Sequence, residues 1–356
     1  MASRGTSHQI PEASIPTKAG PLLELKNLKM YFPITRGLFH RVVGHVKAVD
    51  DVSLTIRKNE TLALVGESGC GKTTLGRCIV RIYDPTAGAI NFVEENGDVT
   101  DLAALQGKSM KPYRQAVRMI FQDPYSSLNP RMTVLQIVGE PLKRHKIAHG
   151  TELEDRVADL LHKVGLRPEY IHRYPHAFSG GERQRIGIAR ALALYPRIVI
   201  ADESVSALDV SVQAQILNLL QDLQAEFHLT YLFVAHDLSV VEYLSDRVAV
   251  MYVGKLVELG TTAQIFAEPK HPYTEALLSA VPKPDPRLRD TGARIRLTGD
   301  VADNADPPNG CYFHPRCRYC QDRCKVEEPA FRDIGQGRRS ACHFVEELQL
   351  NGVKGV

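Results

Sequence analysis

The feature that most constrains the fold is a glycine-rich loop between an apolar run and a helix-forming segment. Residues 61–65 are mostly apolar, residues 75–82 favour a helix, and GESGCGKTT lies between them, from Gly66 to Thr74. Glycines at this spacing let backbone N–H groups turn toward a phosphate chain, and the positive end of the following helix dipole adds to the attraction. An ordinary glycine-rich turn would require neither the strand nor the helix. The pattern is that of a P-loop, and it predicts a nucleoside triphosphate site in an α/β fold.

Two side chains of this loop have distinct expected roles. Lys72 provides a cation for the β- and γ-phosphates, and the hydroxyl of Thr73 can ligate Mg²⁺. Backbone N–H groups of the loop surround the phosphates. The predicted nucleotide contacts in the loop are Gly66, Ser68, Gly69, Cys70, Gly71, Lys72, Thr73 and Thr74.

Two further strands are expected to deliver polar residues to one edge of the sheet. Residues 197–201 form an apolar run typical of a buried parallel strand, and Asp202 and Glu203 follow it. Ligands sit at the carboxyl ends of strands in open α/β sheets. We therefore expect Asp202 to hold Mg²⁺ through water and Glu203 to orient the attacking water. Two adjacent acids could also form a solvated turn, but His236 follows another apolar run, residues 231–235, and is expected at the same edge.

The segment between the P-loop and these strands predicts an inserted helical block. Apolar residues recur at helical spacing from about residue 124 to residue 178. After this block, Ser179 and Glu182 have the spacing of a capping box and predict a helix over residues 182–194. The cap explains both residues, whereas Gly180 and Gly181 also suit the close approach of an anion. Other predicted strands cover residues 22–32, 46–56 and 117–121, and an antiparallel hairpin is predicted at residues 247–259.

Length and composition limit the class of protein. The chain has 356 residues, 44% of them hydrophobic, and a formal net charge of +3. This leaves room for one large domain and a smaller one, and the charge is too small to indicate a nucleic-acid partner. No apolar run approaches the length of a membrane span. The polar residues 1–20 predict a loose tail rather than a signal peptide, and a reducing compartment would disfavour disulfides among the seven cysteines.

Taken in order, these motifs resemble the ATPase subunits of ABC transporters across residues 22–260. The resemblance implies a P-loop NTPase fold with an antiparallel β subdomain and an inserted α-helical subdomain, binding ATP and Mg²⁺. It implies that Gln122 senses the γ-phosphate and belongs to the Mg²⁺ site, and that Ser179 to Glu182 contact the ATP of an opposite subunit. The remaining roles that it implies are an adenine-stacking ring, a catalytic glutamate, the D-loop aspartate and the switch histidine, at Phe32, Glu203, Asp209 and His236 respectively.

A narrower resemblance links the chain to the ATPases of dipeptide and oligopeptide importers. It rests on HPYTEALL at residues 271–278 with the proline-rich segment after it, on a long insertion at residues 34–45, and on residues 125–130. It implies peptide uptake powered from the cytoplasmic face of the inner membrane, to which the chain would be peripherally bound. Related importers carry nickel, glutathione or oligosaccharides. The implied partners are a second, related ATPase, two permease subunits and an extracytoplasmic substrate-binding protein.

The same resemblance gives the expected domain boundaries. They are an N-terminal tail at residues 1–20, an ATPase domain at 21–270 with its helical subdomain at about 124–178, and a C-terminal extension at 271–356. The competing class is a soluble ABC protein that acts on ribosomes or DNA. Such chains usually have two P-loops or a long coiled coil, whereas this chain has one P-loop and no coiled-coil heptads.

Five of the seven cysteines lie between Cys311 and Cys342, in a segment that has few large apolar side chains from about residue 299 onward. Metal ligation supplies folding free energy where packing cannot, and four thiolates suit zinc or an iron–sulfur cluster. The importer resemblance implies a [4Fe-4S] cluster, with Zn²⁺ as the alternative, and it leaves Cys320 as an extra thiol. Because the segment is remote in sequence from every ATP motif, its expected role is to dock against a partner subunit. The implied ligands are Cys311, Cys317, Cys324 and Cys342.

Overall fold

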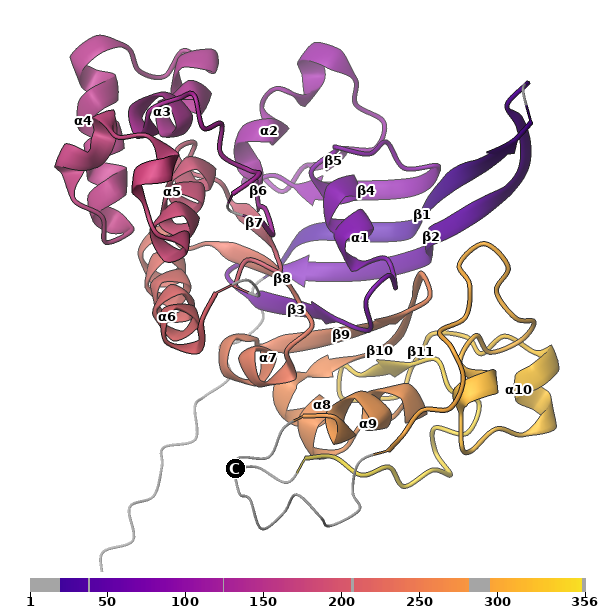
Figure 1. Cartoon of the computed structure of the whole chain (residues 1–356). Coiled ribbons are helices and arrows are strands. Elements are labelled where there is room, and N and C mark those ends of the chain that lie inside the picture. The colour runs from indigo at the N-terminus through magenta and orange to yellow at the C-terminus, as the bar shows by residue number, and fades with distance from the viewer. Residues whose placement is uncertain (1–19, 38, 124, 206–207, 282–294, 354–356) are drawn as a thin grey trace, which may run out of the picture.

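The computed structural model describes residues 20–37, 39–123, 125–205, 208–281 and 295–353. Residues 1–19 of the predicted tail lie outside this part of the chain, as does most of the proline-rich segment after residue 281. The described residues form an eight-stranded and a four-stranded β-sheet with helices around them (Figure 1).

The eight-stranded sheet forms the centre of the molecule, with the strand order β11-β12-β10-β9-β3-β8-β7-β6. Strands β9, β3, β8, β7 and β6 are parallel to one another, and β9 and β10 form the predicted antiparallel hairpin. Every residue of β3, β7 and β8 is buried, which explains why their sequences are mostly apolar. The sequence located β6, β7 and β8 to within one residue at either end. The bounds are β3 (Thr61–Val65), β6 (Val117–Ile120), β7 (Ile198–Asp202), β8 (Thr230–Ala235), β9 (Arg247–Tyr252), β10 (Lys255–Thr261), β11 (Arg332–Asp333) and β12 (Arg339–Ser340).

The four-stranded sheet is antiparallel, with the strand order β2-β1-β4-β5. Its strands are β1 (Pro21–Arg36), β2 (Arg41–Arg57), β4 (Ala87–Val93) and β5 (Val99–Asp101). The insertion at residues 34–45 is not a separate loop between two short strands. It continues β1 and β2 as one long hairpin in which Ile34 pairs with Gly44, so its backbone groups bond across the ladder. This hairpin projects at the upper right of Figure 1.

Helices from the predicted inserted block pack together on the left of Figure 1. α3 (Val134–Arg144) contacts both α4 (Gly150–Lys163) and α5 (Gly180–Leu192), and α6 (Val210–Phe227) lies against α5. Their apolar residues recur at helical spacing and face one shared core, in which Val138, Val157, Leu161 and Ile186 have no exposed surface. Short 3₁₀ turns, η2 (Pro168–His172) and η3 (Pro175–Ala177), lead into α5.

The remaining helices surround the central sheet and the C-terminal segment. α1 follows the P-loop and contacts β7 and β8, while α7 contacts β3 and β8. The bounds of these elements are η1 (Gly107–Met110), α1 (Lys72–Ile79), α2 (Tyr113–Ala116), α7 (Leu238–Leu244), α8 (Thr262–Ala267), α9 (Pro272–Ser279), η5 (His314–Arg316) and α10 (Asp322–Val326).

The C-terminal segment is anchored in the core of the preceding domain. Phe313 is 2% exposed and packs against the rings of Tyr252 and Tyr273, with centroid separations of 5.3 and 5.4 Å. In addition, β12 pairs with β10 and so extends the central sheet. The sequence indicated too few apolar residues for a core in this segment. The structure shows that Phe313 and β12 instead contact residues that precede this segment in sequence, namely Tyr252, Tyr273 and β10.

His271, which caps the start of α9, is buried in this contact and makes a pH-dependent contribution to stability. It is 1% exposed, its Nδ1 accepts a hydrogen bond from the Tyr273 N–H at 3.1 Å, and burial lowers its pKa from 6.5 to about 3. The unfolded chain therefore binds a proton as the pH falls below 6.5, while the folded chain does not until about pH 3. The stabilisation that comes from keeping His271 neutral is therefore fully present above pH 6.5, and it is lost progressively as the pH falls below that value.

We expect acidification from about pH 7 to about pH 5 to remove about 2 kcal/mol of unfolding free energy through His271 alone. Urea unfolding of the wild type and of His271→Asn at both values measures this share, since asparagine can accept the same hydrogen bond without titrating. An identical pH dependence in the two proteins would show that His271 does not carry the effect.

Candidate functional site

The P-loop connects β3 to α1 and lies against two neighbouring backbone segments. A Cβ atom on Gly66 would be 2.1 Å from the Met251 carbonyl oxygen, and one on Gly71 would be 2.0 Å from that of Ala48. Gly71 also has a φ of +107°, so both positions require glycine. Lys72 is 4% exposed, and its ammonium donates to the carbonyls of Gly66 at 2.7 Å and Glu67 at 3.0 Å. The ammonium group of Lys72, the predicted phosphate-binding cation, thus lies inside the curve of the P-loop and bonds to carbonyls of the same loop.

Thr73 and Asp202 meet at the edge of the sheet, as expected for residues at the start of α1 and the end of β7. The Thr73 hydroxyl donates to Asp202 Oδ1 at 2.9 Å. Asp202 is 1% exposed, and this burial raises the pKa of its carboxyl, against the lowering effect of the Thr73 hydrogen bond. A hydroxyl and a carboxylate in contact are oxygen donors of the kind that Mg²⁺ takes.

Gln122, Glu203 and His236 form a second group beside the first. They follow the neighbouring strands β6, β7 and β8. Gln122 Nε2 donates to Glu203 Oε2 at 2.7 Å, and His236 Nδ1 lies 3.7 Å from the same oxygen. A hollow of about 140 Å³ opens beside Glu203 and His236. The Glu203 carboxylate therefore lies beside a space that can hold water.

Glu203 has a backbone conformation that is rare for a residue with a side chain. Its φ is +43°, and its N–H donates to the Val234 carbonyl of β8 at 3.0 Å. Such a conformation costs about 1–3 kcal/mol and persists where the surroundings impose it, commonly at functional sites. The hydrogen bond to β8 holds the backbone turn at Glu203, the first residue after β7.

The Ser179 capping box is present and opens α5 two residues earlier than predicted. Ser179 Oγ accepts from the Glu182 N–H at 3.3 Å, and Glu182 Oε2 accepts from the Ser179 N–H at 2.9 Å. Asp209 caps α6 by accepting from the Val212 N–H at 2.9 Å. Within the described part of the chain, no hydrogen bond or ion pair joins Ser179–Glu182 or Asp209 to the P-loop. Because the family resemblance predicts a role for these residues, and because they lack such contacts with the P-loop, we refer to them below as the second functional surface.

The proposed adenine-stacking residue has an aromatic neighbour that sequence reasoning missed. Phe32 in β1 is half-buried and packs edge-on against Tyr83, which follows α1, with 5.3 Å between the ring centroids. No local sequence signal indicates that Tyr83 packs against Phe32, because only the fold brings the chain after α1 to β1.

The four cysteines named as ligands line one hollow, together with His314 and His343, and Cys320 does not line it. Burial raises the pKa of Cys311 and Cys317 to about 12 and that of Cys342 to about 11, and neighbouring thiols add to each shift. As they stand, the described residues contain no group of three or more His, Cys, Asp or Glu side chains that could hold a metal ion.

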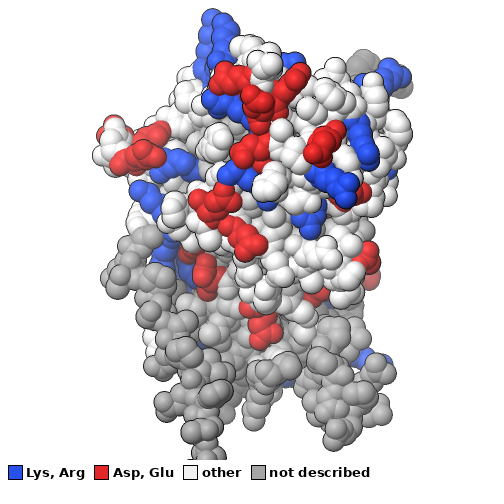
Figure 2. Space-filling view, turned by 90° about the vertical axis from the view of Figure 1, so that its left-hand side faces the viewer, with Lys and Arg blue, Asp and Glu red and all other residues white. Residues whose placement is uncertain are grey.

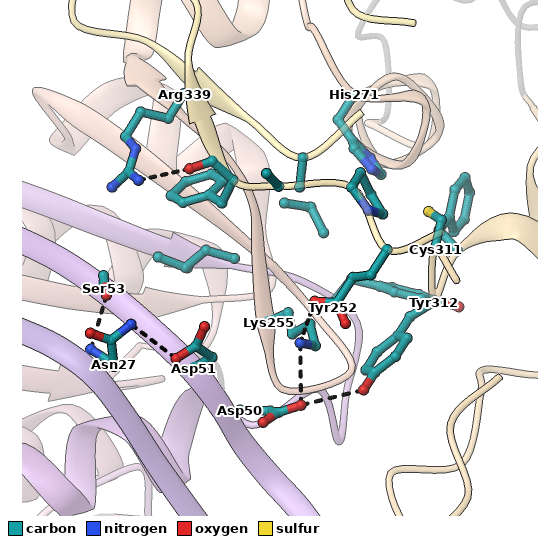
Figure 3. A pocket seen from close by; sticks show the side chains of 18 residues that line it. Asn27, Asp50, Asp51, Ser53, Tyr252, Lys255, His271, Cys311, Tyr312 and Arg339 are labelled. Carbon is teal, nitrogen blue, oxygen red and sulfur yellow. Dashed lines mark hydrogen bonds and ion pairs between the residues drawn. The ribbon is translucent and has the colours of Figure 1, made fainter. Parts of the chain in front are cut away.

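A larger cavity, of about 330 Å³, lies between β2, the β9–β10 hairpin and the C-terminal segment. Figure 3 shows Asp50 directed toward Lys255 and the hydroxyl of Tyr312, each 3.3 Å from the Asp50 carboxylate. Cys311 lies on the wall of this cavity as well as on the wall of the cysteine-lined hollow. The C-terminal segment thus lies beside β2 of the four-stranded sheet and beside the β9–β10 hairpin of the eight-stranded sheet. Its position in the sequence did not predict these contacts.

A P-loop at the end of β3, with acidic, amide and imidazole side chains at the ends of the adjoining parallel strands, defines a P-loop nucleoside triphosphatase. Residues 49–206 match the family model described as ABC transporter, and residues 257–324 match the one described as oligopeptide/dipeptide transporter, C-terminal region. No helix within the described residues has both the length and the apolar character needed to span a membrane.

Individual proteins agree with these matches. The chain is 51% identical to the oligopeptide transport ATP-binding protein AppF of Bacillus subtilis over 91% of its length and 97% of the relative's. It is 47% identical to the dipeptide transport ATP-binding protein DppF of Escherichia coli over 92% and 95%. The dimeric structure of the ATP-binding cassette MJ0796 bound to ADP and Pi aligns with a TM-score of 0.59 and 27% identity, covering 68% of this chain and 99% of that one. The chain belongs to the oligopeptide/dipeptide family of ABC transporter ATP-binding proteins, and it is an ATPase.

Proposed function

We propose that this chain hydrolyses ATP to drive the import of di- or oligopeptides from the cytoplasmic face of the inner membrane. The observation that carries the proposal is the match of residues 257–324 to the oligopeptide/dipeptide transporter region, on a chain whose P-loop adjoins Asp202 and Glu203. The chain works with a second, related ATPase, two permeases and an extracytoplasmic substrate-binding protein. Its domains are the ATPase domain at residues 21–270, with a helical subdomain at about 124–178, and a C-terminal extension from residue 271.

The geometry supports a division of work among the site residues. The P-loop backbone and Lys72 bind the phosphates, and Thr73, Asp202 and Gln122 would hold Mg²⁺, directly or through water. Glu203 polarises the attacking water in the hollow beside it, and the contacts of Gln122 and His236 hold its carboxylate in position. Phe32 stacks on the adenine.

The second functional surface acts in another subunit. Ser179–Glu182 and Asp209 stand apart from the P-loop of their own chain, and the N–H groups at the start of α5 are suited to bind a phosphate. The solved relative MJ0796 is described as a dimer. A dimer in which each α5 start faces the partner's P-loop completes two ATP sites.

The alternative solutes are nickel, glutathione and oligosaccharides, and the alternative class is a soluble ABC protein acting on ribosomes or DNA. Figure 2 shows basic and acidic side chains interspersed on the face that carries the helical block, without the single-signed basic patch that a nucleic acid would favour. The net charge of +3 is in keeping with that surface.

The test is uptake by the complete transporter. Permeases, both ATPases and the binding protein are assembled in proteoliposomes, with MgATP inside and labelled dipeptide, oligopeptide, glutathione, oligosaccharide or nickel outside. We expect ATP-dependent peptide uptake, and the chain on its own should hydrolyse ATP far more slowly than the complex. Uptake of another solute with no response to peptide would overturn the substrate assignment. Full turnover by an isolated monomer would overturn the shared site.

A [4Fe-4S] cluster is the second part of the proposal. The four thiols expected to hold it line one hollow from which Cys320 is excluded. The thiols match such a group in number and chemistry, since the cluster takes four thiolates, and the cluster would have to draw them together from positions that form no metal-holding group as they stand. A bound cluster would join Cys311 and Cys317 to Cys324 and Cys342 within the C-terminal segment. Zinc remains the alternative occupant of the same thiols.

A further inference from the structure

The cysteine-rich segment contacts the P-loop directly, although 249 residues separate the two in sequence. Two parallel hydrogen bonds join the Arg316 guanidinium to the Glu67 carboxylate, from Nη1 to Oε2 at 2.6 Å and from Nη2 to Oε1 at 3.0 Å. The Arg316 side chain is 8% exposed and that of Glu67 26%. A bidentate, largely buried pair of this kind is among the stronger polar contacts in proteins.

Two other contacts hold the same stretch of loop from the same direction. Asn304, in the C-terminal segment, donates from Nδ2 to the Gly69 carbonyl at 3.1 Å. The Tyr273 hydroxyl accepts from the Glu67 N–H at 2.7 Å. Lys72 meanwhile bonds the carbonyls of Gly66 and Glu67. The Glu67 carboxylate, the Glu67 N–H and the Gly69 carbonyl are therefore held by residues outside every nucleotide-binding motif, whereas the Glu67 carbonyl is held by Lys72 of the P-loop itself.

Glu67 is also the only acid in the loop GESGCGKTT. A free carboxylate next to bound phosphates would repel them, and in a partly buried site water screens the repulsion poorly. Arg316 neutralises this charge and holds the Glu67 side chain toward the C-terminal segment.

We propose that Arg316 is a positioning residue for nucleotide binding, which acts through Glu67 to neutralise the loop and to fix residues 67–69 for the phosphates. The inference rests on nucleotide binding at the P-loop. Because Arg316 directly precedes Cys317, it also gives the cysteine-lined hollow a short connection to the ATP site. The segment is remote from the ATP motifs in sequence but contacts the P-loop in space, and its docking against a partner subunit stays a prediction.

The test is a mutant cycle on the full-length chain, with MgADP as the probe so that hydrolysis does not interfere. Isothermal titration calorimetry gives the dissociation constant for wild type, Arg316→Ala, Glu67→Gln and the double variant. We expect Arg316→Ala to weaken MgADP binding about tenfold (about 1.4 kcal/mol), because it leaves Glu67 charged and unheld. Glu67→Gln should cost less, and Arg316→Ala should add nothing in the Glu67→Gln background.

Arg323→Ala is the matched control. Arg323 also precedes a cysteine and also makes a bidentate pair, with Glu327 at 2.7 Å for each bond, but at the surface and away from the loop. It should leave the MgADP affinity unchanged. Arg316→Lys keeps the charge with poorer geometry and should restore part of the affinity; it also serves if Arg316→Ala does not fold.

Three results would overturn the inference: unchanged affinity in Arg316→Ala, an equal loss when Glu67 is already glutamine, or an equal loss in Arg323→Ala. A wild-type chain that does not bind MgADP would instead refute the P-loop site itself. Melting temperatures of the same variants distinguish a general loss of stability from a loss of nucleotide binding. A general loss of stability would lower the melting temperature without changing the MgADP affinity at a temperature where the protein is folded.

Discussion

Replacing Glu203 with glutamine is expected to lower the ATP turnover of the assembled transporter about a hundredfold or more while leaving nucleotide binding intact. The amide oxygen can still accept the hydrogen bond that Gln122 donates at 2.7 Å, so the local geometry is retained. What is lost is the negative charge that polarises water in the adjoining hollow. The contrasting variant is Lys72→Ala, which should weaken binding itself because the cation for the phosphates is removed.

Single-turnover hydrolysis and equilibrium MgATP binding, measured on the same preparations, separate these two effects. Glu226→Gln provides a matched control, because Glu226 lies on the surface of α6 and pairs with Lys163 rather than with the site. Wild-type turnover in the Glu203→Gln complex would remove Glu203 from the reaction.

The second large effect concerns the C-terminal thiols. Purified without oxygen, the chain is expected to be brown and to contain about four iron and four sulfide per molecule. Serine at any one of the four positions lining the hollow should abolish the colour, because each thiolate would hold one corner of the cluster. The variants are Cys311→Ser, Cys317→Ser, Cys324→Ser and Cys342→Ser.

Cys320→Ser is the internal control, since Cys320 belongs to the same segment but does not line the hollow. It should retain colour, iron and sulfide. Stoichiometric zinc with no iron in the anaerobic protein would replace the cluster with a zinc site. Bleaching by Cys320→Ser would show that the ligand set is different.

Much of the ATP site could be predicted because its signals are local. The strand, glycine loop and helix around Lys72 follow one another in sequence, and the Ser179 cap depends only on a residue three positions later. Asp202, Glu203 and His236 were expected together because parallel strands end at one edge of a sheet, and the contacts of Glu203 with Gln122 and His236 agree with that expectation.

The contacts that could not be predicted join residues far apart in sequence. Arg316 and Glu67 each look like ordinary surface charges, and only the docking of Phe313 against Tyr252 and Tyr273 brings them together. The extension of β1 and β2 into the insertion at residues 34–45 could not be predicted for a related reason. This stretch mixes apolar and basic residues with two glycines and so shows no regular strand pattern, whereas pairing between β1 and β2 decides whether the ladder continues into it.

The short strands β11 and β12 have a further consequence for how this protein can be truncated. They cover the side of β10 that would otherwise be the open border of the central sheet, and Arg338 reaches the fully buried Glu258 of that strand at 3.2 Å. A chain ended after residue 270 would bare a row of unpaired backbone groups and leave Glu258 without this arginine. Bare strands of this kind recruit strands from other molecules. Cutting away the C-terminal extension to isolate the ATPase would therefore produce an aggregation-prone protein rather than a smaller soluble one.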